Sequence, residues 1–209
     1  MKSHKNATKC FIGNDIIATN DSSNQLSFSN QKYLNKILTD KELLFFKENI
    51  TLDYFPFLLW TCKESAYKIQ LKEGLNQNFQ PLEYEVEIFS SIKCGDHNIT
   101  EGKVNYDKTC HFFQSQVYLD YISTIACAEN RSLSKTQSYV GYCGDYDYSK
   151  DMRYHLTKRL AAHFKKEQAN FDILKTDEGI PYVQSIFNLE MPDISFSHDG
   201  GYYSYAMLL

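Results

Sequence analysis

The sequence predicts an α+β protein built from two similar halves, each a helix with an antiparallel sheet. The chain has 209 residues, enough for one large domain or two small ones. Aromatic residues make up 15% of it, with only 9 Gly and 4 Pro, a mix that favours strands over long flexible loops. A helical pattern followed by alternating patterns occurs in residues 1–130 and again, in shorter form, in residues 150–209. We expect residues 131–149 to be the linker between the halves.

The first half opens with an apolar run, residues 10–18, which predicts a buried strand that carries one acidic side chain. The polar residues 19–30, rich in Asn and Ser, predict a loop. Thr39 and Glu42 have the spacing of a capping box, so a helix should begin there. A second helix is expected from about residue 57 to residue 72, because Gly74 follows as a stop signal.

Alternating apolar residues beyond Pro81 predict antiparallel strands. In the first half these are expected at residues 84–89, 111–118 and 121–128. The second half should begin with a basic amphipathic helix, residues 152–166. Its strands are expected at residues 171–174, 182–184, 194–198 and 202–208. The last two should form a hairpin, because an Asp-Gly-Gly turn joins them.

Charge and composition exclude several classes of function. The formal net charge is −4, so bulk electrostatics attract neither nucleic acid nor an anionic membrane. The longest apolar run, residues 55–60, is too short for a transmembrane helix, which needs ~20 residues. Residues 1–9 lack the apolar segment of a signal peptide, and the six cysteines include no C-x-x-C pair. We therefore expect a cytoplasmic protein with reduced thiols and no nucleic-acid or membrane partner.

The most informative stretch is the second expected helix. Trp60, Glu64 and Lys68 fall four residues apart, on one helical face. Glu64 and Lys68 alone could be a surface ion pair of little energetic value. The only Trp of the chain on the same stripe favours a different interpretation, in which this face forms the wall of a cleft.

Asp15 lies within an apolar strand, where a carboxylate is costly unless it is hydrogen-bonded, paired or bound to a cation. It could be a structural residue that accepts backbone N–H bonds. If it faces Glu64, the two carboxylates could instead hold Mg²⁺ together with a substrate phosphate.

A third group of polar residues closes the strand at 194–198. Ser197 and His198 precede a glycine-rich turn, where a hydroxyl, an imidazole and free N–H groups could bind phosphate oxygens. A lone histidine at a strand end is more often structural, so both interpretations remain open.

Together these pieces resemble the 4'-phosphopantetheinyl transferase superfamily, which includes the holo-acyl-carrier-protein synthases. The resemblance rests on Gly13-x-Asp15, on Trp60-x-x-Lys63-Glu64-x-x-x-Lys68, which is the most specific motif, and on Ser195-x-Ser197-His198. In the two-halved members of the family the Ser-His motif precedes G-x-D, whereas here it comes last. The resemblance therefore implies this family's fold, with the halves in swapped order and joined as a pseudo-dimer. One chain would then form a whole site as a monomer; a homotrimer, as in the short synthases, is the alternative.

The resemblance implies transfer of 4'-phosphopantetheine from coenzyme A to a serine of an apo acyl or peptidyl carrier protein, with release of 3',5'-ADP. Asp15 and Glu64 would bind Mg²⁺, and Glu64 and Lys68 would be the catalytic residues. Contacts with coenzyme A are implied for Lys63, Lys68, Arg153, Arg159, Gly179, Pro181, Ser197 and His198. Ile180 and Asp199 depart from the family pattern, in which Lys and Ser or Thr are common at these positions.

Two other functions stay open. A lapsed member of the family could bind coenzyme A or a carrier protein without turnover, as the two departures suggest. A metal-dependent phosphodiesterase acting on a small nucleotide would also use two carboxylates and a histidine, although it would not explain the spacing from Trp60 to Lys68.

Overall fold

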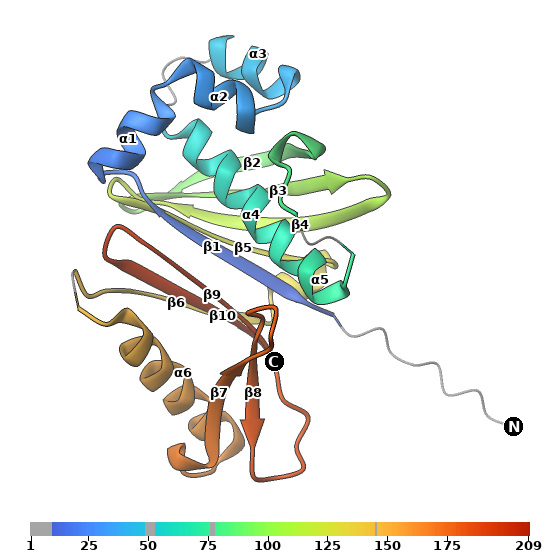
Figure 1. Cartoon of the computed structure of the whole chain (residues 1–209), viewed down its shortest axis with the longest axis vertical. Helices are drawn as coiled ribbons and strands as arrows, with labels where there is room; N and C mark the ends of the chain where they lie inside the picture. The colour runs from blue at the N-terminus through green and yellow to red at the C-terminus, as the bar shows by residue number, and fades with distance from the viewer. Residues whose placement is uncertain (1–9, 49–52, 76–77, 145) are drawn as a thin grey trace, which may run out of the picture.

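The computed structural model describes residues 10–48, 53–75, 78–144 and 146–209. Residues 1–9, in which no signal peptide was expected, lie outside the described residues. The described chain forms two parts, one above the other in Figure 1, each with a long helix on an antiparallel sheet. The α+β class predicted from the sequence is confirmed. None of the helices in these residues combines the length and apolarity needed to cross a membrane.

The first part is a five-stranded antiparallel sheet in the order β1-β5-β4-β3-β2. Its strands are β1 (Ile12–Ala18), β2 (Tyr84–Cys94), β3 (His97–Tyr106), β4 (Thr109–Val117) and β5 (Tyr121–Cys127). Its helices are α1 (Ser22–Phe28), α2 (Gln31–Ile37), α3 (Asp40–Glu48) and α4 (Phe55–Glu73), and a short 3-10 turn, Pro81–Glu83, precedes β2. Helix α4 crosses one face of this sheet, and α1 to α3 lie at its end (Figure 1).

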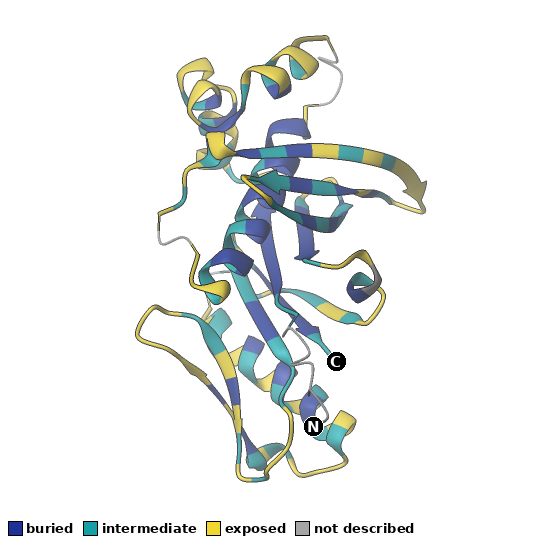
Figure 2. Cartoon of the chain, turned by 90° about the vertical axis from the view of Figure 1, so that its right-hand side faces the viewer, coloured by how far each residue is buried: buried dark blue, intermediate teal, exposed yellow. Residues whose placement is uncertain are grey.

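Helix α4 carries the core of this part. It begins with Pro56 in its first turn and ends at Gly74, whose φ of 71° is the left-handed conformation that stops a helix. Leu58, Cys62 and Ile69 are buried in one cluster with the sheet. Figure 2 shows this buried helix and the exposed far end of the β2–β3 hairpin.

The second part is a three-stranded sheet with a long helix and a separate hairpin. Its elements are β6 (Thr136–Tyr142), α6 (Tyr148–Phe164), a 3-10 turn (Gln168–Asn170), β7 (Phe171–Lys175), β8 (Pro181–Ser185), β9 (Asp193–Asp199) and β10 (Tyr202–Leu208). The short helix α5 (Asn130–Leu133) connects the two parts and packs on β4 and β5 of the first sheet. The strand order is β6-β10-β9, and β7 pairs with β8. Leu156 and Leu160 of α6 are fully buried in one cluster with Tyr205 of β10.

The capping box predicted at Thr39 and Glu42 is confirmed. The backbone N–H of Thr39 donates to Glu42 Oε2 at 2.8 Å, and the N–H of Glu42 donates to Thr39 Oγ1 at 3.3 Å. The box thus satisfies two N–H groups at the start of α3.

Three segments differ from the expectation. Residues 19–30 are not all loop, because α1 begins at an Asp21 cap that accepts from the N–H groups of Ser23 and Asn24. Strand β3 was not expected, because its many polar residues hide the alternation. Residues 131–149, expected as a linker, contain β6, which is an edge strand of the second sheet rather than a free connection.

Candidate active site

Gly13 brings helix α4 against strand β1. A Cβ at this position would lie 1.8 Å from the backbone oxygen of Ser65, so any side chain would push the helix away. Since side chains alternate along a strand, Asp15 lies on the same face of β1 as Gly13, where it meets Lys68 of α4. The Gly-x-Asp spacing therefore has a direct structural reason.

Asp15 is buried and receives donors from both parts of the molecule. Lys68 Nζ of α4 donates to Asp15 Oδ1 at 3.0 Å, and Ser197 Oγ of β9 donates to the same oxygen at 2.6 Å. The side chain of Lys68 is 24% exposed and that of Asp15 is 10% exposed, so solvent reaches this pair. A site that depends on both halves is thus formed within one chain.

Glu64 lies one turn before Lys68 on the same face of α4. Burial raises the pKa of Glu64 to about 7, the negative charge of Asp15 adds to the shift, and Lys68 opposes it. Tyr33 and Tyr67 are close enough for the Glu64 charge to raise their own pKa values, after the larger effect of burial. The two carboxylates and Lys68 are therefore close enough for their charges to act on one another.

This donor set fits a magnesium ion. Mg²⁺ is usually held by one or two carboxylates, with substrate phosphates and water as its other ligands. Asp15 and Glu64 supply two hard oxygen donors whose mutual repulsion a cation would relieve. Within the described ranges no group of three or more His, Cys, Asp or Glu residues could hold a metal ion.

The two halves meet where β1 and β9 run side by side in the same direction. Side chains of β9 accept from the backbone N–H groups on the free edge of β1. The bonds run from Ile12 to Asp193 Oδ2 (2.8 Å), from Asn14 to Ser195 Oγ (3.0 Å), from Ile16 to Ser197 Oγ (3.2 Å) and from Ala18 to Asp199 Oδ2 (2.8 Å). The strands are therefore joined through side chains rather than through a shared backbone ladder.

Two lysines of α4 bridge the same junction. Lys68 Nζ donates to the carbonyl oxygens of Asn14 (2.8 Å) and Phe196 (3.3 Å). One turn later, Lys72 Nζ donates to the carbonyl oxygens of Ile12 (2.6 Å) and Ile194 (2.7 Å). It also forms an ion pair with Asp193 at 2.7 Å. Each lysine thus ties β1 to β9.

A small cavity of about 170 Å³ lies beside Lys68 at this junction. Gly179 and Pro181, two of the residues expected to contact coenzyme A, line it together with Lys175. The cavity is therefore shared by both halves. Three lysines, Lys68, Lys72 and Lys175, outnumber the one acidic residue of its lining, Glu178, which suits an anionic ligand.

Lys63 does not lie in the cleft. Its side chain is fully buried and donates to Glu42 (2.6 Å), to the carbonyl oxygen of Ile37 (2.8 Å) and to that of Pro81 (3.0 Å). Burial lowers the pKa of Lys63, and the charge of Glu42 opposes that shift. The structure gives Lys63 a scaffold role in place of the expected contact with coenzyme A.

His198, Arg153 and Arg159 lie on the α6 side of the second sheet. The exposed His198 ring packs on Tyr148 with ring centres 3.8 Å apart. Arg153 donates to the carbonyl oxygen of Ile173 and, at 3.3 Å, to a serine hydroxyl one turn earlier in α6. The guanidinium carbon of Arg159 lies 6.0 Å from the ring centre of Tyr139 and 5.9 Å from that of Tyr205. The structure therefore does not bring these three side chains to Asp15.

Some functional candidates were missed in the sequence. Lys72 has a readable signal, because it continues the four-residue spacing from Glu64 and Lys68. Lys175 has none, because its place beside the cleft depends on how β7 meets the first half. Trp60 was expected in the cleft wall; its ring packs in an aromatic cluster, 5.4 Å from the ring of Phe79 and 6.3 Å from that of Tyr33, and its place in the wall stays a prediction.

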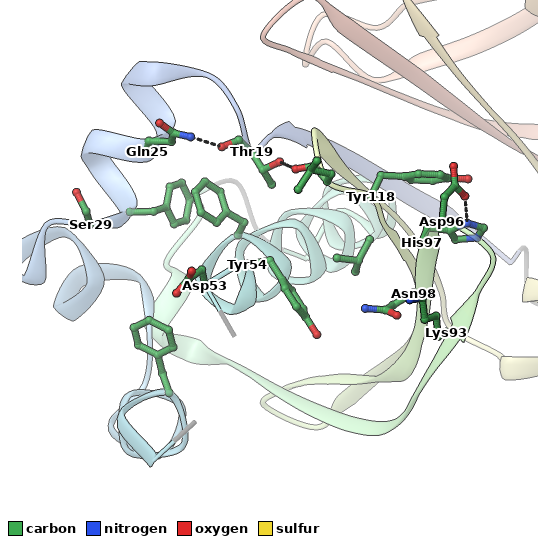
Figure 3. Close-up of a pocket in the computed structure, with 15 residues that line it drawn as sticks. Thr19, Gln25, Ser29, Asp53, Tyr54, Lys93, Asp96, His97, Asn98 and Tyr118 are labelled. Atoms are coloured by element: carbon green, nitrogen blue, oxygen red, sulfur yellow. Dashed lines mark hydrogen bonds and ion pairs between the residues drawn. The ribbon is translucent and has the colours of Figure 1, made fainter. Parts of the chain in front are cut away.

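A larger cavity, of about 770 Å³, lies where α1 and the start of α4 meet the end of the first sheet. Figure 3 shows Gln25 and Ser29 on one side of it, and Lys93 and Asn98 on the other. None of the residues expected at the active site lines this cavity, so we do not place the chemistry there.

Comparison with known families agrees with this geometry. Neither the curated proteins nor the solved structures gave a match. The model of the 4'-phosphopantetheinyl transferase superfamily matches residues 11–127, which is more than half of the chain and includes Asp15, Glu64 and Lys68. The chain therefore belongs to the 4'-phosphopantetheinyl transferase superfamily.

Proposed function

We propose that this protein transfers 4'-phosphopantetheine from coenzyme A to a serine of an apo acyl or peptidyl carrier protein. The observation that carries the proposal is the meeting of Asp15, Glu64 and Lys68 at the junction of the two halves, in a chain of this family. The nucleophile in this reaction is the carrier serine, so no activated serine or cysteine of this chain is required.

In the proposed reaction the hydroxyl oxygen of the carrier serine attacks the phosphorus that bears pantetheine. A new P–O bond forms to the serine, the bond to the bridging oxygen breaks, and 3',5'-ADP leaves with that oxygen. Glu64, directly or through a water, accepts the serine proton. A magnesium ion held by Asp15 and Glu64 would neutralise the pyrophosphate and polarise the attacked phosphorus.

Lys68 is proposed to hold Asp15 in place and to stabilise negative charge on the pyrophosphate. Its ammonium donates to Asp15 and to two carbonyl oxygens, so contact with a phosphate would need one of these bonds to be exchanged. Ser197 orients Asp15 by the 2.6 Å bond to its carboxylate.

For the nucleotide end of coenzyme A we propose the small cavity beside Lys68, with Gly179, Pro181 and the added residue Lys175. His198 stays in the proposed set, because its ring is exposed next to Ser197 in the sequence. Arg153 and Arg159 are left out, because their contacts lie within the second half.

We also propose that the protein works as a monomer whose swapped halves form a pseudo-dimer. Asp15 and Ser197 bond to one another within a single chain, so a second copy is not needed to complete this contact. Full activity in the monomer fraction of a light-scattering separation would support this, whereas activity confined to a trimer would contradict it.

The test of the function uses the purified protein with coenzyme A, Mg²⁺ and a panel of apo carrier proteins from the same genome. Mass spectrometry should show a carrier heavier by one phosphopantetheine group, and formation of 3',5'-ADP should match it. Binding of coenzyme A without any gain in carrier mass would overturn the proposal and identify a lapsed member of the family. Hydrolysis of small nucleotides without a carrier would identify a phosphodiesterase.

A further inference from the structure

The junction between β1 and β9 raises the question of what fixes its register. The two strands belong to different sheets, and the contacts along the free edge of β1 are made by β9 side chains at alternate positions. No continuous backbone ladder joins these strands in the described residues, so the register depends on which side chains stand at those four positions.

The two central positions are chemically identical. Ser195 accepts from Asn14, and Ser197 accepts from Ile16. A shift of β9 by two residues would keep the same face toward β1, since side chains alternate along a strand. It would place one serine where the other now lies, so the serines alone do not distinguish the correct register from the shifted one.

The two end positions are aspartates, and they do distinguish the registers. Asp193 accepts from the Ile12 N–H at 2.8 Å and pairs with Lys72 at 2.7 Å, with both side chains at most 10% exposed. Asp199 accepts from the Ala18 N–H at 2.8 Å and from Asn24 Nδ2 at 2.5 Å.

A shift of two residues in either direction would be unfavourable. A shift in either direction would move the carboxylate of Asp193 away from the ammonium of Lys72. The two charges would then be buried without their ion-pair partner, which is costly. The shift would also bring one of the two end carboxylates closer to the buried Asp15, where like charges repel.

We infer that Asp193 and Asp199, with Lys72, are positioning residues that fix the register of β9 against β1 and thereby place Ser197 on Asp15. Asp199 departs from the family pattern at its position. Its carboxylate accepts from the Ala18 N–H of β1 and from Asn24, so it stabilises the contact between β1 and β9. The inference about register stands on these contacts alone, and only its consequence for turnover rests on the proposed function.

The test follows backbone amide hydrogen exchange by NMR in the full chain. In Asp193→Ala the amides of both Ile12 and Ile16 should exchange at least tenfold faster than in the wild type, because the whole strand loses its fixed register. Asp193→Asn keeps an acceptor for the Ile12 N–H but removes the charge that pairs with Lys72, so both amides should exchange faster than in the wild type, though less so than in Asp193→Ala. Asp172→Ala, an exposed aspartate on β7 of the same half, is the matched control and should change neither amide.

A local effect would look different. If Asp193 is only a partner for the neighbouring N–H, Asp193→Ala will speed exchange at Ile12 and leave Ile16 at its wild-type rate. That result, or unchanged exchange at both amides, would overturn the inference. If Asp193→Ala does not fold, Asp199→Ala provides the same test from the other end, with Ala18 as the local amide and Ile16 as the distant one.

The activity readout separates this inference from the proposed function. In carrier modification, kcat of Asp193→Ala should fall at least tenfold while the KM for coenzyme A changes less than threefold, and kcat of Asp193→Asn should lie between those of Asp193→Ala and the wild type. The expected exchange pattern in a protein without transferase activity would leave the register inference intact and overturn the proposed function instead. Wild-type kcat in a variant with altered exchange would overturn the link between register and turnover.

Discussion

Two of the lysines of helix α4, Lys63 and Lys68, each pair with a carboxylate from another element, and the two pairs differ in their surroundings. Lys63 and Glu42 are 0% and 4% exposed and lie 2.6 Å apart, sealed between α4 and α3. Lys68 and Asp15 are 24% and 10% exposed and lie 3.0 Å apart, at the edge of the cleft. Both lysines also donate to backbone carbonyl oxygens.

The difference shows that a single motif, Trp60-x-x-Lys63-Glu64-x-x-x-Lys68, contains both a lysine that stabilises the fold and residues proposed to take part in the reaction. Residues 63 and 64 are separated by about 100° around the helix, so they face different surroundings, whereas 64 and 68 share a face. A buried ion pair has all its partners in the protein and fixes structure, while the pair at the cleft can exchange a partner for a substrate. Burial, rather than residue type, separates the two roles.

The largest expected effect on stability is at the sealed pair. Lys63→Met should lower the free energy of unfolding by ~3–5 kcal/mol, because it leaves Glu42 charged and buried without its ion-pair partner. Urea unfolding of Lys68→Met is the matched measurement. We expect less than half that loss there, because solvent reaches Asp15. Equal losses in the two variants would remove the distinction drawn between the pairs.

The next effect is at the contact that brings the cleft residues together. Gly13→Ala should cost about 3 kcal/mol, because its Cβ overlaps the Ser65 backbone and forces α4 off β1. Gly74→Ala, at a positive φ with open space around it, should cost only about 1 kcal/mol. Only Gly13→Ala should also reduce transferase rate in its folded fraction. Normal activity in that variant would contradict the role given to the close approach.

How far the sequence predicts this molecule depends on whether a signal is local. The strand at Asp15, the capping box at Thr39 and the face shared by Glu64 and Lys68 are set by spacing within a few residues, and the structure has each of them. Strands β3 and β6 were missed because solvent-facing polar residues weaken their alternation. The burial of Lys63 could not be predicted, because Glu42 reaches it only through the packing of α3 on α4.

A smaller effect concerns His111, a sealed group without a partner. Both ring nitrogens lack a hydrogen-bond partner in the described structure, and burial lowers the pKa of His111 to about 4. The folded state therefore stays neutral between pH 6.5 and 4, while the unfolded state takes up a proton. Stability should fall by about 2 kcal/mol from pH 7 to pH 5 on this account.

Urea unfolding at the two pH values measures this fall. His111→Leu should remove it, whereas His163→Leu, at an exposed position on α6, should leave it in place. The same pH dependence in His111→Leu as in the wild type would show that another group causes it.

The smallest effect is expected at a third pair, Lys41 and Glu85, whose side chains are 76% and 42% exposed. Salt and water screen such pairs, so Glu85→Gln should leave the urea midpoint within experimental error. A clear loss of stability would contradict the expectation that the stabilising effect of the pairs Lys63–Glu42, Lys68–Asp15 and Lys41–Glu85 decreases with their exposure.

The central claim is that Glu64, with Asp15 and Lys68 beside it, carries the chemistry. Its most direct test is the initial rate of carrier modification by Glu64→Gln at a folded concentration equal to that of the wild type. We predict a fall of ~10³-fold with little change in the free energy of unfolding, since the amide keeps the shape and loses the negative charge. A rate near that of the wild type would contradict the account.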